Sequence, residues 1–157
     1  MLLLTLALSP AVAAAGTFSA AGGSSGAKSK GVTYKGKTSQ GDKFSMTVTS
    51  PSKGKVTKGL IDWKQTCSGE FTSLTGGTTF KNVKISGGSF HLKGKYSAPV
   101  TSSGGGSYVG DFTASISGKT SSSKASGTFS ISTKIYSGST EVSSCKAEGI
   151  SWSAKKA

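Results

Sequence analysis

The sequence contains no arginine, one histidine and only six acidic residues, against 19 lysines. Forked recognition of phosphate and stacking on bases favour arginine, so its absence argues against sequence-specific binding of nucleic acid. A single histidine leaves no histidine pair for a zinc site, and we expect neither a metal nor another cofactor. The net charge of +13 instead predicts loose, salt-dependent attraction to anionic polymers, although a coat of charge that protects strand edges explains the lysines equally well.

The sequence also lacks an apolar run of the roughly 20 residues that a transmembrane span requires. Its most apolar stretch is Leu2–Leu8, which Pro10 ends, and two small-residue cleavage sites follow, Ala11-Val12-Ala13 and Ala13-Ala14-Ala15. We therefore predict a signal peptide over residues 1–15, even though no lysine precedes the leucines. The protein is then secreted and either extracellular or associated with the cell envelope. A buried N-terminal strand is the alternative interpretation of the same residues.

Proline is scarce, with three residues, whereas glycine contributes 23 and hydrophobic residues make up only 34%. With abundant serine and threonine, this composition favours a turn-rich β protein with a thin core over a helical protein. We expect a flexible Gly/Ser/Ala linker over residues 16–30, in which Phe18 is loose. One domain then covers residues 31–157.

Short alternating runs in this domain predict about eight strands. Two irregularities are expected among them. The apolar phase breaks near Asn82, which indicates a bulge. Cys145 and Trp152 are an odd number of residues apart, so both face the core only if Gly149 kinks the last strand.

Cys67 and Cys145 are the only cysteines. In an oxidising compartment they form the one intramolecular disulfide that two cysteines allow, for which the loop-entropy estimate is about 4.5 kcal/mol. Such a bridge needs Cα atoms within about 7 Å, and the third and eighth strands of a sequential meander are not neighbours. We therefore predict an antiparallel β-sandwich of about eight short strands with one disulfide. A closed eight-strand β-barrel is the alternative.

Three short motifs resemble a known group of proteins. They are the turn Gly36-Lys37-Thr38-Ser39-Gln40-Gly41 after Tyr34, the step Cys67-Ser68-Gly69, and Trp152-Ser153-Ala154 near the end of the sequence. Over roughly residues 31–155 the chain is similar to uncharacterised secreted bacterial β-domains, mostly actinobacterial. The resemblance implies export, a single-domain β fold and a cysteine pair, and it transfers no active site.

Groups for acid–base catalysis are sparse, and we predict that the protein is not an enzyme. Asp62 and Asp111 fall on strand faces opposite the apolar stripes, and a hydrolase that uses this pair is the alternative. Any other carboxylate site would require Glu70 or His91 to converge with them in one cleft. We expect His91 to be a solvated strand residue.

Phe71, Tyr108 and Tyr136 lie at predicted loop–strand junctions, where aromatic rings either stack on a ligand or seal the end of a sandwich. These three are our candidate ligand contacts. The contact region is expected in two loops, at residues 72–77 and 101–107.

The function that we predict is a secreted, non-catalytic module that binds anionic envelope polymers or glycans through a lysine-rich surface. The second hypothesis is a small barrel that binds an apolar small molecule. Its cavity would be lined by Phe90, Phe112, Phe129 and Ile131. An enzyme with an unrecognised carboxylate site is the third.

Overall fold

A computed structural model describes residues 9–13, 16–19 and 31–157 of the 157-residue chain. Every regular element among them is a β-strand. In order, these are β1 (Ser9–Ala13), β2 (Gly16–Ser19), β3 (Val32–Thr38), β4 (Lys43–Val48), β5 (Lys55–Gly69), β6 (Phe71–Lys81), β7 (Val83–Lys84), β8 (Ser89–Ser102), β9 (Tyr108–Thr120), β10 (Lys124–Ser137) and β11 (Thr140–Lys156). The described part holds no helix long and apolar enough to cross a bilayer.

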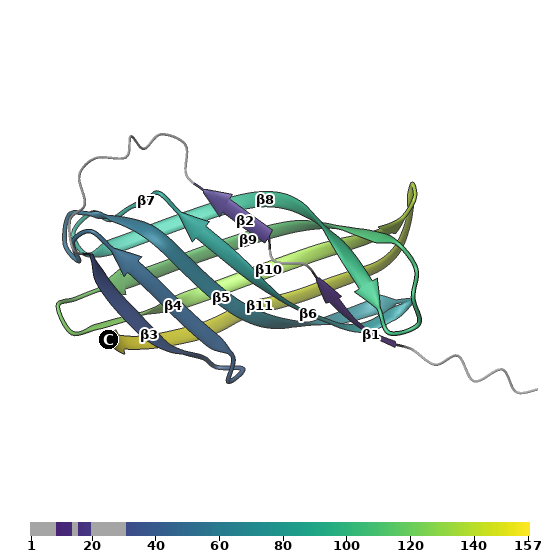
Figure 1. Cartoon of the computed structure of the whole chain (residues 1–157), viewed down its shortest axis with the longest axis horizontal. Helices are drawn as coiled ribbons and strands as arrows, with labels where there is room; N and C mark the ends of the chain where they lie inside the picture. The colour runs from purple at the N-terminus through teal and green to yellow at the C-terminus, as the bar shows by residue number, and fades with distance from the viewer. Residues whose placement is uncertain (1–8, 14–15, 20–30) are drawn as a thin grey trace, which may run out of the picture.

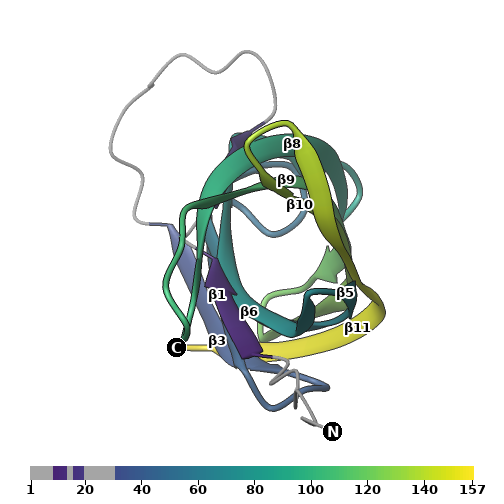
Figure 2. The ribbon, with the colours of Figure 1, turned by 90° about the vertical axis from the view of Figure 1, so that its right-hand side faces the viewer.

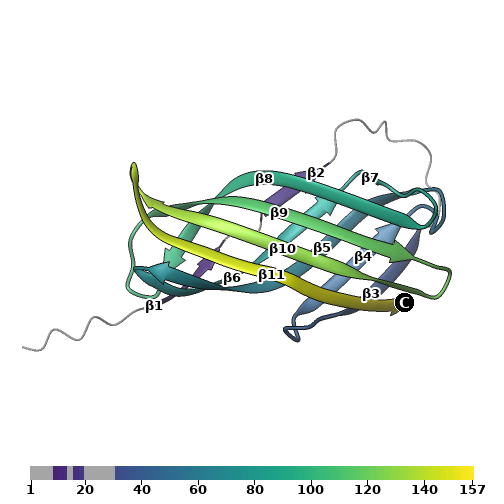
Figure 3. The same cartoon turned by 180° about the vertical axis from the view of Figure 1, so that it is seen from behind.

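The strands form one sheet of eleven strands whose two halves face each other across the core. Strands β3 to β6 cross in front of β8 to β11 in Figure 1, and Figure 3 shows the second wall from behind. All neighbouring strands run antiparallel except β1 and β2, which run parallel to β6. The predicted all-β class, with walls that face each other as in a sandwich, is confirmed.

Hydrogen bonding joins the two walls along both edges. At one edge β5 pairs with β11, and at the other β1 lies between β6 and β8. The ladder therefore runs in a ring around the core, which Figure 2 shows along the long axis of the molecule. There are more strands than the eight expected, and several are long, with 17 residues in β11.

The interior is filled by aromatic rings that lie on glycines of the neighbouring strand. Phe80 is directly opposite Gly59, Trp63 is opposite Gly76, and Trp152 is opposite Gly127. A Cβ atom built on any of these glycines would lie within 2.9 Å of the ring that covers it. Glycine in this sheet therefore makes room for large side chains, which explains why Gly76 lies inside a strand and not in the predicted loop at residues 72–77.

Tyr96 joins these rings through a short polar network. The Trp63 Nε1–H donates to the Thr78 hydroxyl at 2.9 Å, and the Thr78 and Tyr96 hydroxyls are 2.7 Å apart. The Tyr96 ring stacks on Phe112 with centroids 4.8 Å apart. Burial raises the pKa of Tyr96 to about 12, and the hydrogen bond to Thr78 acts in the opposite direction. The phenol is therefore neutral at physiological pH and acts as a structural group.

The residues proposed for an apolar ligand cavity belong to this core. Phe90, Phe112, Phe129 and Ile131 are all buried. Phe90 packs near Trp152 with ring centroids 6.1 Å apart, and Phe112 lies between Tyr96 and Trp63. All four belong to the buried hydrophobic cluster of the core.

The irregularity predicted at Gly149 is confirmed, whereas the break near Asn82 is not the predicted bulge. Gly149 has a φ of +65°, and the register between β10 and β11 shifts at this point, between Phe129 and Ile131. The Gly149 N–H donates to the Ser130 hydroxyl at 3.0 Å. Asn82, with a φ of +60°, separates β6 from β7. The register against β5 is the same on both sides of Asn82, with Phe80 opposite Gly59 and Val83 opposite Val56, so no extra residue is inserted there. Both breaks keep apolar side chains on the core side of long strands.

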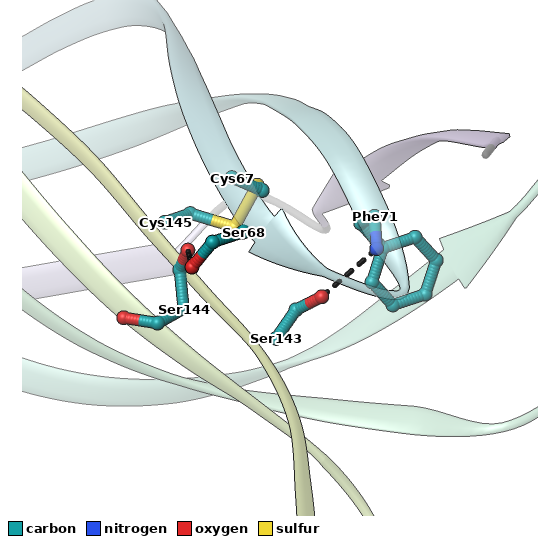
Figure 4. Close-up of a disulfide and its surroundings, with 6 residues drawn as sticks. All are labelled: Cys67, Ser68, Phe71, Ser143, Ser144 and Cys145. Carbon is teal, nitrogen blue, oxygen red and sulfur yellow. Dashed lines mark hydrogen bonds between the residues drawn. A yellow bond between two sulfur atoms is a disulfide. The ribbon is translucent and has the colours of Figure 1, made fainter.

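The predicted disulfide joins Cys67 of β5 to Cys145 of β11 (Figure 4). The two residues are direct cross-strand partners with Cα atoms 4.0 Å apart. Beside the bridge, the Ser143 hydroxyl accepts a hydrogen bond from the Phe71 N–H at 2.9 Å. The bridge thus fastens the β5–β11 edge, where segments 78 residues apart in the sequence meet.

Parts of the predicted leader and linker lie in strands. Ser9–Ala13 forms β1 and Gly16–Ser19 forms β2. Phe18, expected to be loose, is instead only 5% exposed and packs near Phe80 and Tyr96, because Gly94 leaves room for its ring. The remaining residues of both segments lie outside the described part, and cleavage of the leader stays a prediction.

Gly76→Ala should lower the free energy of unfolding by about 1–3 kcal/mol, because overpacking a core usually costs about this much. Its Cβ would lie 2.8 Å from the buried Trp63 ring. Gly77→Ala is the matched control, since its Cβ would lie 2.8 Å from Asp62 Oδ1, the end of a flexible side chain on the outer face, and its other neighbours are at ordinary contact distances of 3.7 Å or more. Urea unfolding of both variants checks the prediction, and equal destabilisation would contradict the packing explanation.

The double variant Cys67→Ala/Cys145→Ala should be less stable by about 2–4 kcal/mol, the usual range for a disulfide that closes a long loop. Urea unfolding with and without a reducing agent provides the measurement. The reductant should destabilise the wild-type protein and leave the double variant unchanged. A wild-type midpoint that does not respond to reduction would show that the bridge contributes nothing.

Candidate anion-binding surface

The candidate catalytic groups do not meet. Asp62 lies on the outer face of β5, opposite Gly77, whereas Asp111 lies on the outer face of β9, in the other wall. His91 is exposed on β8 opposite Ser117, and Glu70 occupies the turn between β5 and β6. The described residues contain no group of three or more His, Cys, Asp or Glu side chains that could hold a metal ion.

The three candidate aromatic contacts also have different surroundings. Phe71 is buried and meets Tyr108 edge to face, with ring centroids 5.0 Å apart. Tyr136 is half-buried on β10, where its partner on β9 is Val109. Phe71 and Tyr108 therefore close one end of the core together, and Tyr136 is not part of that contact.

Exposed lysines gather on the outer face at the opposite end, around the C-terminal part of β11. Figure 3 shows where this part of the strand lies, beside the C-terminus. Lys155 of β11 is the direct cross-strand partner of Lys124 on β10 and of Lys35 on β3. Lys37 of β3 is likewise opposite Lys43 of β4. Cross-strand partners have Cβ atoms about 4.5–5.5 Å apart, so these side chains are immediate neighbours.

A second row extends this cluster across β9 and β10. Lys119 is opposite Ser126, which is opposite Ser153, which in turn is opposite Lys37. We call the six exposed lysines of the two rows the lysine face. They are Lys35, Lys37, Lys43, Lys119, Lys124 and Lys155.

Acidic side chains do not neutralise the lysine face. Within the described ranges, the ion pairs are Lys64–Asp42 at 3.4 Å and Lys134–Glu141 at 3.5 Å, and neither includes one of the six lysines. Glu70 and Glu141 lie at the far end of the molecule, at the turns into β6 and β11. Asp42 directly precedes Lys43, but its carboxylate pairs with Lys64 of β5. The charge of the protein is therefore unevenly distributed, and one end carries an excess of positive charge.

Two shallow hollows lie on the wall of β8 to β11, and only one of them, which Lys119 and Ser126 line, adjoins the lysine face. Small hydroxyl side chains line both of them, and lysines edge them. In one, the Ser97 hydroxyl donates to an Asp111 carboxylate oxygen at 2.6 Å, beside Lys95 and Lys134. The other includes Lys119 of the lysine face. The wall thus offers hydroxyl groups and ammonium groups close to one another.

Sequence reasoning recognised the excess of lysine and predicted a lysine-rich surface, but it did not identify which lysines form one. The six lysines come from five strands, and no two of them are adjacent in the sequence. The register across β10, β11, β3 and β4 brings them together, and that register depends on contacts between distant segments. A comparison of the chain with protein-family models, curated proteins and solved structures finds no match.

Lys155→Gln should raise the free energy of unfolding by about 0.2–1 kcal/mol at low salt. It removes the central charge of a cross-strand row and with it the repulsion between that charge and its two lysine neighbours. The gain should shrink in high salt, where the screening length falls to about 3 Å at 1 M. Lys146→Gln is the control, since Lys146 lies on the same strand between Ser132 and Thr66. An equal gain in the free energy of unfolding in both variants would show that the effect comes from the net charge of the protein and not from repulsion between neighbouring lysines.

Proposed function

We propose that this protein is a non-catalytic module that binds anionic polymers through the lysine face. The observation that carries the proposal is the row of Lys124, Lys155 and Lys35, which places three positive charges directly opposite one another with no ion-paired carboxylate among the described residues. Like charges in these positions destabilise a sheet. A bound polyanion relieves that repulsion, so binding and folding stability are coupled.

The lysine face is suited to recognise a high density of negative charge on a polymer, and not a specific sequence or shape of that polymer. Lysine is a hydrated point charge on a flexible stem and does not form the rigid fork with which arginine recognises phosphate or carboxylate. Ser126 and Ser153, between Lys119 and Lys37, add hydroxyl groups to the same row. A flexible polymer with repeated phosphate or carboxylate groups fits this surface, and its affinity depends strongly on salt.

The compartment that suits such a module is the cell envelope or the medium outside it. The disulfide favours an oxidising compartment, and the apolar N-terminal stretch favours export. Anionic envelope polymers and acidic glycans are the ligands available there in bulk. The proposed role is therefore loose retention of the protein on such polymers.

Long-chain inorganic polyphosphate is the probe that tests the lysine face, with neutral dextran as the blank. The triple variant Lys35→Gln/Lys124→Gln/Lys155→Gln should bind polyphosphate more weakly than the wild type. The slope of log affinity against log salt should fall by about 3, roughly one for each lysine that no longer pairs with a phosphate. Fluorescence anisotropy of labelled polyphosphate across a salt series provides both quantities.

The matched control is Lys93→Gln/Lys95→Gln/Lys146→Gln, which removes the same charge from exposed positions outside the face. It should keep most of the affinity and of the salt slope. Equal weakening in the two triple variants would show that net charge alone attracts the polymer. Binding that salt does not weaken, or binding to dextran, would overturn the proposal.

A further inference from the structure

Strand β1 is the hydrogen-bonded link between β6 and β8 in the described part of the chain. On one side it runs parallel to β6, with Ala11 opposite Leu74 and Val12 opposite Thr75. On the other side it runs antiparallel to β8, with Ala11 opposite Ser102. Figure 1 shows β1 at the end of the molecule opposite the C-terminus of β11. We call the junction of β6, β1 and β8 the seam.

The side chains of β1 follow the pattern of an inserted strand. Ala11 and Ala13 point into the core and are 1% and 6% exposed, whereas Val12 points outward and is 55% exposed. The Ala13 position has little spare space, because a Cβ on Gly76 would already lie 3.2 Å from the Ala13 Cβ, and Ala11 is almost fully enclosed. The seam therefore selects small side chains at two alternate positions and accepts any residue between them.

Both predicted leader cleavage sites lie at the end of this strand. Cleavage after Ala13 or after Ala15 separates β1 from β2, which begins at Gly16. Phe18 anchors β2 in the core independently of β1, through its ring contacts with Phe80 and Tyr96. Processing would thus remove one strand of the ring and leave its neighbours in place.

We propose that the seam is a strand-binding slot, which β1 fills in the uncleaved chain and which opens when the leader is removed. Its ligand is an extended peptide with small side chains at two alternate positions, the pattern of Ala11-Val12-Ala13. An empty slot leaves backbone N–H and C=O groups on the facing edges of β6 and β8 without hydrogen-bond partners, and an added strand supplies those partners. The added strand also covers Leu74 and Val100, which are buried in the closed ring.

Protein recovered from the medium of an exporting host tests the slot, with the uncleaved chain as reference. Mass spectrometry locates the N-terminus, and hydrogen exchange reports on residues 71–75 and 100–102. The proposal expects a chain that begins after Ala13 and exchanges faster than the reference in these two segments. A synthetic peptide of residues 9–15 should restore slow exchange there.

Two altered peptides define the specificity. The peptide with V12S changes only the outward position and should restore slow exchange as well as the natural sequence does. The peptide with A11F and A13F places large rings at the inward positions and should have no effect. Any of four results would overturn the proposal. The recovered chain could begin at or before Ser9, or its exchange could already be as slow as in the reference. Its exchange could be fast but reversed by no peptide, or the A11F/A13F peptide could act as well as the natural one.

Discussion

Aromatic rings that lie on glycines are the contact on which this fold depends. Trp63, Phe80 and Trp152 each face a glycine of the neighbouring strand, and a Cβ on that glycine would overlap the ring. An aromatic side chain buries about 150–250 Å², so a few such pairs supply much of the apolar area of a core. A chain with only 34% hydrophobic residues can therefore close a sheet around its interior.

The same packing determines where the charges lie on the outside. Side chains alternate along a strand, and a slip of one residue would exchange the two faces of β11. With Trp152 held against Gly127, Lys155 has to lie opposite Lys124. On the other side, the close approach of Gly36 to the backbone of Ser153 and Ala154 accompanies the register that places Lys155 opposite Lys35. The lysine face is therefore a consequence of the register that the core imposes. Its repulsion is tolerated because the buried rings oppose any shift that would separate the lysines.

Local features of the fold were predictable, because they depend on neighbours in the sequence. The alternation of apolar residues located most strands, and the odd spacing of Cys145 and Trp152 located the bulge at Gly149. The interpretation failed at residues 72–77, where Thr75-Gly76-Gly77 has the composition of a turn. Whether Gly76 belongs to a turn or lies beneath Trp63 depends on a strand pairing that composition does not record. The position of the lysine face escaped prediction for the same reason, since its members meet only across strands.

The two edges where the walls join are fastened in different ways. At the β5–β11 edge, the Cys67–Cys145 bridge holds the strands covalently. At the β6–β8 edge, β1 contributes backbone hydrogen bonds and two buried alanine side chains, which together bury little apolar surface. Because β5 and β6 are themselves paired over eight residues, removal of β1 would not separate β6 from its own wall. The ring would then open at one seam only, while the disulfide keeps the walls together at the other.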